Sequence, residues 1–212
     1  MRILLLRHGE TTWTAEHRYQ GATDTPLSDV GRRQATALAE RLRGVAFGEI
    51  LSSPLQRAWD TAAAIAALHE APLEADRRLR EIGFGQWEGL THDAICREAP
   101  ARYLGWQSDP GETTPPEGEP MEEVLRRVGD LWREISALPR GVTIGLVGHG
   151  ACLRALLCVA LEVPTSAFWR FQLGAASLSE LYVHAGGAKL VLLNDRNHLN
   201  DVGATPSGAH PF

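Results

Sequence analysis

Two histidines in this chain each follow an apolar run and precede a glycine. His8 comes after residues 3–6, and His149 comes after residues 141–148. An aliphatic run that ends at a glycine is typical of a buried strand that stops at a turn. In an open α/β sheet, ligands bind at the carboxyl ends of the strands. If both strands lie centrally in one sheet, the two imidazoles meet at one ligand-binding edge.

Two arginines can join the histidines. Arg7 precedes His8, and Arg57 lies in the first turn of a helix expected to start at Pro54. Guanidinium groups bind phosphate oxygens bidentately, and the N-termini of the helices expected after Pro54 and His149 would add backbone N–H donors. A neutral imidazole can attack phosphorus through one ring nitrogen while a backbone carbonyl holds the other N–H. The combination favours a pocket for a dianionic phosphoryl group.

Each of these residues has a simpler interpretation when it is taken alone. A histidine at a strand end is more often structural than nucleophilic, and Arg57 could be a solvated helix residue, so the hypothesis depends on their joint occurrence. A metal site is a competing interpretation, but the sequence has no His-x-His or HExxH spacing, and two adjacent arginines repel a cation. We therefore expect no metal and no other cofactor.

Composition sets the class of protein. The chain has 212 residues, of which 44% are hydrophobic and 22% charged, and a formal net charge of −5. These values suit one soluble α/β domain and argue against binding to nucleic acid. Its three cysteines form no CxxC pair, no signal peptide is visible, and the apolar segment 151–161 contains Arg154 and cannot span a bilayer. We expect a cytoplasmic protein with no membrane partner.

Apolar periodicity predicts the elements that position the site. We expect helices over residues 28–43, 53–68, 122–138 and 151–161, and two shorter ones starting at 91 and 100. Strands are expected over 3–6, 49–51, 72–75 and 141–148, followed by a hairpin over 178–193. Ser28 and Ser53 are the expected N-caps, residues 11–27 are expected to form a loop, and residues 108–120 a mobile surface loop. The alternation predicts a three-layer α/β/α sandwich with a mostly parallel central sheet, one domain over 1–194, and a polar tail over 195–212.

Motifs across most of the chain resemble the histidine phosphatase superfamily, also called phosphoglycerate mutase-like. The matching stretches are residues 6–11 with Trp13, residues 19–21, residues 25–28 with Gly31, residues 52–58, residues 61–62, residues 79–89 and residues 147–150. They occur in the family's order between residue 3 and about residue 160, which makes the signal specific. The resemblance implies the same α/β/α fold.

The resemblance also implies roles for individual residues. His8 would be the nucleophile that becomes phosphorylated, with Arg7, Arg57 and His149 binding the phosphoryl oxygens and stabilising charge during transfer. Glu81 would give a proton to the leaving oxygen and then serve as base for the attacking water.

Other residues are assigned to the site or away from it by the same comparison. Gln20, Gly21 and Gly150 would contact the substrate or its phosphoryl group. The family commonly has Asn where this chain has Thr14, whose hydroxyl could still donate one hydrogen bond to phosphate. We read Glu10 as turned into the loop, Glu88 as structural, and Arg154 as a structural ion-pair partner.

The function expected from the sequence is hydrolysis of a small phosphorylated metabolite through a phosphohistidine on His8, without a metal. The alternatives are a cofactor-dependent phosphoglycerate mutase and a non-catalytic binding protein on the same fold. Residues 108–120 contain three glutamates and an aspartate but no Lys or Arg, and residues 83–89 resemble broad-specificity and α-ribazole phosphate phosphatases, which favours the phosphatase. The substrate and the oligomeric state stay open, a homodimer included, although residues 11–27 and a lid over 108–120 are expected to select the substrate.

Overall fold

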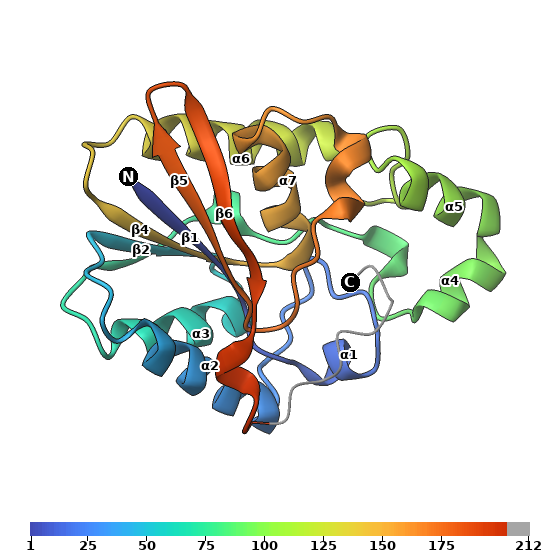
Figure 1. The fold of residues 1–212 in the computed structure, drawn as a ribbon. Helices are drawn as coiled ribbons and strands as arrows, with labels where there is room; N and C mark the ends of the chain where they lie inside the picture. Colours follow the sequence, from blue (N-terminus) through green and yellow to red (C-terminus); the bar gives the residue numbers. More distant parts are fainter. Residues whose placement is uncertain (203–212) are drawn as a thin grey trace.

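A six-stranded sheet lies at the centre of the computed structural model, which describes residues 1–202 (Figure 1). Its strands are β1 Arg2–Arg7, β2 Glu49–Ser52, β3 Leu73–Ala75, β4 Thr143–Gly148, β5 Leu178–His184 and β6 Gly187–Asp195. The order across the sheet is β3-β2-β4-β1-β5-β6. The first four strands in this order are parallel to one another, and β5 pairs antiparallel with both β1 and β6. The predicted mostly parallel sheet and the predicted hairpin are both confirmed.

Helices cover both faces of the sheet (Figure 1). One face carries α2 Asp29–Leu42 and α3 Gln56–Ala66, the other carries α6 Met121–Ser136 and α7 Gly150–Ala160, and α4 His92–Glu98 and α5 Pro100–Ser108 lie to one side. Because successive side chains of a strand point to opposite faces, Ile3 and Leu5 of β1 join the core under α6 and α7, whereas Leu4 and Leu6 join the core under α2 and α3. This is the predicted three-layer sandwich.

The helix starts agree with the sequence in one case and differ in another. The Ser28 hydroxyl accepts from the Gly31 N–H at 3.0 Å and caps α2, as predicted. The prediction that Ser53 caps the next helix is wrong, because α3 begins at Gln56 after Leu55 and has no side-chain cap. The predicted loop over 11–27 also contains a short helix, α1 Thr12–Ala15.

The end of the described chain is more ordered than the composition indicated. β6 continues through Asp195, and Leu199, in the 3-10 turn Asn197–Leu199, is fully buried in the core on the α2 side. The fold therefore continues past the predicted boundary at 194, because one leucine anchors an otherwise polar segment. The rest of the predicted tail, residues 203–212, lies outside the described residues.

Residues 109–120 form the loop that was predicted between α5 and α6. Backbone hydrogen bonds tie it to the segment that follows Glu81: Gln86 N donates to Pro116 O at 2.9 Å, and Glu119 N donates to Gly83 O at 2.7 Å. The loop is thus held against residues 83–86, where the sequence indicated a mobile segment. Among the described helices, none is both long enough and apolar enough to cross a membrane.

Candidate active site

The carboxyl ends of β1 and β4 bring His8 and His149 together. The two strands pair in parallel with Arg7 opposite Gly148, so the residues that follow them emerge at the same edge. The imidazole ring centroids are 5.0 Å apart, and both histidines are buried. The two imidazoles therefore meet at one edge of the sheet, as the hydrophobic pattern predicted.

The geometry of His8 leaves one ring nitrogen available for attack. Its Nδ1 lies 2.6 Å from the carbonyl oxygen of Gly9. Since a carbonyl can only accept, Nδ1 carries the proton and Nε2 keeps its lone pair. Burial and the nearby Arg57 and Arg7 lower the pKa of His8 well below 6.5, so the ring is neutral at neutral pH. A side chain at Gly9 would meet Gly31 O at 2.5 Å, so glycine is required there.

His149 is oriented by Ser53. The Ser53 hydroxyl accepts from the Leu55 N–H at 3.3 Å and lies 2.8 Å from His149 Nε2. Burial, followed by Arg57, His8 and Arg7, lowers the pKa of His149 well below 6.5. Which of the two atoms donates depends on the tautomer of the ring, and the other ring nitrogen, Nδ1, is buried without a hydrogen-bond partner among the described residues. Ser53, which was predicted to cap a helix, instead forms a hydrogen bond with His149 and so orients that ring.

The guanidinium groups of Arg7 and Arg57 are buried and donate to backbone carbonyls. Arg57 Nη1 donates to Thr23 O and Nη2 to Gly21 O, both at 2.8 Å, and Arg7 Nη1 donates to Leu173 O. Neither has a carboxylate within 4 Å in the described part of the chain. Burial lowers the pKa of Arg57 to about 10, so it remains cationic at neutral pH.

Three buried side-chain nitrogens of the site lack a hydrogen-bond partner among residues 1–202. They are Arg7 Nε, Arg57 Nε and His149 Nδ1. Buried polar groups are nearly always satisfied in folded proteins, so an unsatisfied group calls for an explanation such as a bound ion. The two arginines are cations whose charge acts on the neutral His8 ring, and the ring of His149 lies 5.0 Å from it. This arrangement can hold an anion beside the nucleophile.

Glu81 lies between the 3-10 turns Arg77–Leu79 and Gly85–Trp87 and reaches the start of α7. Its Oε1 accepts from Cys152 N at 2.9 Å and from Ile82 N at 3.0 Å, and its Oε2 accepts from Ala151 N at 3.1 Å. Two of the N-terminal donors of α7, Ala151 N and Cys152 N, are therefore occupied by Glu81, whereas the prediction placed phosphate at this helix start.

At the start of α3, Gln56 N donates to Asp24 Oδ1 at 2.8 Å and is therefore not available to phosphate. The positive charge of the pocket comes from its arginine side chains. The start of α7 contributes by positioning Glu81.

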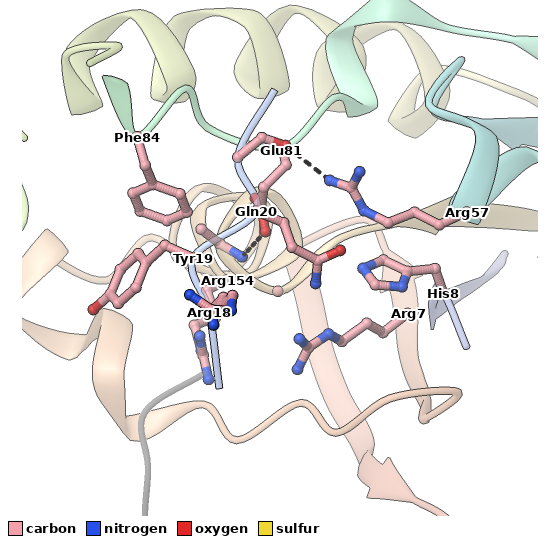
Figure 2. Close-up of a pocket in the computed structure, with 12 residues that line it drawn as sticks. Arg7, His8, Arg18, Tyr19, Gln20, Arg57, Glu81, Phe84 and Arg154 are labelled. Carbon is pink, nitrogen blue, oxygen red and sulfur yellow. Dashed lines mark hydrogen bonds between the residues drawn. The ribbon is translucent and has the colours of Figure 1, made fainter. Parts of the chain in front are cut away.

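One pocket collects most of the predicted residues (Figure 2). Of the predicted residues, its lining includes Arg7, His8, Gln20, Gly21, Arg57, Glu81 and Gly150. Arg18, Tyr19, Phe84, Ala151 and Arg154 complete it. His149 lies beside His8 rather than on the pocket wall. Residues 108–120, predicted to form a lid that selects the substrate, contribute no residue to this lining.

Thr14 does not line the pocket. Its hydroxyl accepts from Gln20 Nε2 at 2.8 Å and lies 3.0 Å from the Thr11 hydroxyl, with which it forms the capping box of α1. Gln20 Oε1 in turn accepts from the hydroxyls of Thr11 and Thr25. The short side chain of Thr14, which was predicted to contact phosphate, turns back to its own helix and holds Gln20, which lines the pocket.

Two other glutamates take the structural positions that were predicted. Glu88 accepts from Ala22 N at 2.9 Å and Thr23 N at 3.0 Å, and so holds the loop whose carbonyls receive Arg57. Gly21 of that loop has a φ of +56°, and a side chain there would clash with Glu88 Oε1. Glu10 accepts from the Ser28 hydroxyl at 3.0 Å, away from the pocket.

Arg154 is the residue that the sequence interpretation misplaced. It is 3% exposed, its Nε donates to Phe171 O at 2.7 Å, and it lines the pocket. The predicted ion pair is absent: within residues 1–202 no carboxylate lies within 4 Å of it. Burial and then repulsion from Arg7 lower its pKa to about 9. The signal for this position was a lone arginine in the apolar segment 151–161.

Known proteins share this sequence pattern over most of the chain. Phosphoserine phosphatase 1 of Hydrogenobacter thermophilus is 31% identical over 201 residues, which cover 95% of each chain. A probable phosphoglycerate mutase GpmB of Yersinia pestis is 36% identical over 85% of this chain and 84% of its own. The bifunctional protein Rv2228c of Mycobacterium tuberculosis is 38% identical over 93% of this chain, but this chain spans only 55% of the length of that relative.

The fold is shared with solved structures as well. The structure of mycobacterial glucosyl-3-phosphoglycerate phosphatase Rv2419c with VO3 superposes with a TM-score of 0.84 at 34% identity, covering 92% of this chain and 99% of that chain. The model of the histidine phosphatase superfamily (branch 1) matches residues 3–196. Given the two histidines at the strand ends and this match over nearly the whole described chain, the protein belongs to branch 1 of the histidine phosphatase superfamily.

Proposed function

We propose that this protein is a phosphomonoesterase that hydrolyses a small phosphorylated metabolite through a phosphohistidine on His8. The observation that carries the proposal is the neutral His8, which has its Nδ1 proton held by Gly9 O and its Nε2 open. Beside it, Arg7, Arg57 and His149 each have a buried side-chain nitrogen without a partner among the described residues. A neutral imidazole is a nucleophile, and fixed N–H groups stabilise the charge that develops on the phosphoryl oxygens. Buried arginines take the electrostatic part that Mg²⁺ plays in other phosphoryl-transfer sites, so we propose a metal-independent reaction.

In the first half-reaction, the lone pair of His8 Nε2 attacks phosphorus while the bond to the ester oxygen breaks. The positive charge that appears on the ring is stabilised by the Gly9 carbonyl at Nδ1. The leaving alkoxide takes a proton from the carboxyl group of Glu81, which lies on the pocket wall.

In the second half-reaction, a water molecule attacks the phosphohistidine. Glu81, now ionised, takes the proton from the water, the P–N bond breaks, and its electron pair returns to Nε2. Inorganic phosphate leaves, and His8 is again neutral. The backbone donors from Ile82, Ala151 and Cys152 hold the carboxylate in place for this exchange.

The same phosphohistidine could return its phosphoryl group to a bound intermediate, as in a mutase. We favour hydrolysis because the loop over 109–120 has no Lys or Arg and none of its residues lines the pocket, so it does not supply a basic cover that would exclude water. The free thiols of Cys96, Cys152 and Cys158 are in keeping with a cytoplasmic location, which we propose as well.

The test of the proposed function is hydrolysis of p-nitrophenyl phosphate in EDTA between pH 5 and 7. We expect turnover by the wild type and none by His8→Ala, because no other group can accept the phosphoryl. His184→Ala, at the opposite end of the sheet, is the matched control and should behave as wild type. Absence of activity in the wild type would favour a non-catalytic binding protein. Formation of 2-phosphoglycerate from 3-phosphoglycerate, with little phosphate released, would indicate a mutase.

The role of Glu81 has a separate test. We expect Glu81→Gln to slow hydrolysis of an alkyl phosphate about 100-fold, but to slow p-nitrophenyl phosphate less than tenfold, since p-nitrophenolate departs without protonation. The comparison requires single-turnover rates of phosphohistidine formation on both esters. Equal losses on the two esters would remove Glu81 from the acid role.

A further inference from the structure

Arg154 is a buried cation whose two terminal nitrogens have no assigned task. Its Nε is used by Phe171 O, and its guanidinium carbon lies 5.7 Å from the ring centroid of Phe168 and 5.2 Å from that of Trp169. These contacts fix the position of the group, and among residues 1–202 no carboxylate forms an ion pair with it, although the charge of Glu81 acts on it from a distance. A buried guanidinium without an ion-pair partner is costly, because burial removes its hydration. Because the guanidinium of Arg154 lies on the pocket wall, its positive charge can bind an anionic group of a ligand.

The position of Arg154 separates it from the phosphoryl-binding groups. In Figure 2, His8 and Arg57 lie at one end of the pocket, Tyr19 and Phe84 lie at the other, and Arg154 lies between them. Arg18, which also lines the pocket, already pairs with Glu16 at 2.5 Å and is partly exposed. Arg7 and Arg57 are the guanidinium groups expected to bind the phosphoryl group. Of the two other arginines that line the pocket, Arg154 is the buried one and is not paired with a carboxylate among residues 1–202, so its charge can act on a ligand.

The balance of charge indicates what kind of group Arg154 receives. Arg7, Arg57 and Arg154 bring three buried positive charges, and a phosphoryl dianion offsets two of them. The oxygens of Glu81, the carboxylate on the same wall, accept from the backbone N–H groups of Ile82, Ala151 and Cys152. Arg154 is then the pocket guanidinium left for a second anionic group, and a guanidinium edge binds a carboxylate through two parallel hydrogen bonds.

We propose that Arg154 binds a carboxylate of the substrate, so that the preferred substrates are phosphomonoesters carrying one carboxylate apart from the phosphoryl group. This inference rests on the proposed function, since it assumes that the phosphoryl group sits at His8. It gives Arg154 a role in specificity rather than in bond breaking. Removing Arg154 should therefore mainly reduce the ratio between the affinity for esters that have a carboxylate and the affinity for esters that lack one.

The test is calorimetric binding of matched ester pairs to His8→Ala, in which no turnover occurs. One pair is 3-phosphoglycerate and glycerol 3-phosphate, and the other is 4-carboxyphenyl phosphate and phenyl phosphate, which holds the carboxylate farther from phosphorus. We expect at least one carboxylate ester to bind tenfold or more tightly than its partner. Adding Arg154→Gln should reduce that ratio to below about twofold. Arg102→Gln, an exposed arginine of α5, is the control and should leave the ratio unchanged.

Two results would overturn the inference: no preference for either carboxylate ester in His8→Ala, or a preference that survives Arg154→Gln. Arg154→Met provides a second variant if the glutamine variant unfolds, because it removes the buried charge without adding a polar group. The proposed function is tested independently by the p-nitrophenyl phosphate assay of the wild type. An active wild type without carboxylate preference contradicts only the role of Arg154, whereas an inactive wild type contradicts the hydrolytic function itself.

Discussion

The buried arginines of the pocket and several arginines at the surface are used in opposite ways. Arg7, Arg57 and Arg154 are buried and donate to backbone carbonyls. At the surface, by contrast, several arginines pair with carboxylates, such as Arg2 with Glu180 at 2.9 Å and Arg43 with Glu40 at 2.6 Å. The chain has 26 acidic residues against 21 Lys and Arg, so a shortage of carboxylates does not explain the difference.

Arg127 of α6 combines features of both groups of arginines. It is largely buried like the pocket arginines, but it pairs with Glu119 through Nε at 2.8 Å and Nη2 at 3.0 Å, and its Nη1 donates to the carbonyls of Arg78 and Arg80. These contacts fix the segment that leads to Glu81. A buried arginine in this protein is thus paired when it supports the structure and left unpaired where an anion is expected. The predictions below test this distinction.

The largest effect is expected from removing an unpaired arginine. Arg57→Met should lower kcat/KM for p-nitrophenyl phosphate by about 10³, equivalent to about 4 kcal/mol, because it removes a fixed charge and a free N–H donor beside the phosphoryl group. Arg43→Met, which removes an exposed paired arginine, is the control and should leave kcat/KM unchanged. Similar losses in the two variants would mean that the pocket arginine has no special function.

The reverse pattern is expected for stability. Arg127→Met should lower the free energy of unfolding by about 3 kcal/mol, because it leaves Glu119 and two carbonyls without their donor. Arg7→Met should change it by less than about 1 kcal/mol, since the loss of one hydrogen bond is offset by removal of a buried, unpaired charge. Urea unfolding of both variants gives the comparison. A greater loss of stability in Arg7→Met would show that the pocket arginines hold the fold together.

Acid should weaken the fold through the two site histidines. Their pKa values are lowered in the folded state, so below pH 6.5 the unfolded chain binds protons that the folded chain does not. Stability should therefore fall as the pH drops from 6.5 toward their folded pKa values, by about 1.4 kcal/mol per pH unit for each histidine. His149→Gln should show a shallower slope than wild type in urea unfolding between pH 5 and 7. An unchanged slope would mean that His149 is protonated in the folded protein.

The smallest effect is expected at the surface. Arg43→Gln breaks a fully exposed pair with Glu40 on α2. Exposed pairs of this kind contribute little, because solvent screens the two charges. We expect no resolvable change in melting temperature at physiological salt. A clear decrease would show that exposed pairs matter here as much as Arg127 does.

The sequence predicted best what depends on local pattern. Apolar runs ending in His8-Gly9 and His149-Gly150 correctly placed both histidines at one sheet edge, because strand burial and the parallel order follow from periodicity. Ser28 was identified as a cap for the same local reason. The side chain of Ser53 was misread because its partner, His149, is 96 residues away, and such a partner leaves no trace in local spacing.

The remaining differences have the same cause. Thr14 was expected at phosphate because of its position in a motif, whereas its hydroxyl binds Gln20 and Thr11 within its own loop. Arg154 was expected to form an ion pair because buried arginines usually do. Whether a carboxylate lies close enough to pair with Arg154 depends on how α7 packs against the rest of the protein, which local sequence does not show.

The most direct test of the account is to identify the residue that carries the phosphoryl group. Wild-type protein mixed with ³²P-labelled ester and quenched within milliseconds should yield protein-bound label that is stable to alkali and lost in acid, as expected of phosphohistidine, and it should map to the peptide containing His8. His8→Ala should yield none, whereas His149→Gln should still be labelled, at a lower rate. Label on any other residue, or hydrolysis at full rate without labelled protein in a single turnover, would contradict the account.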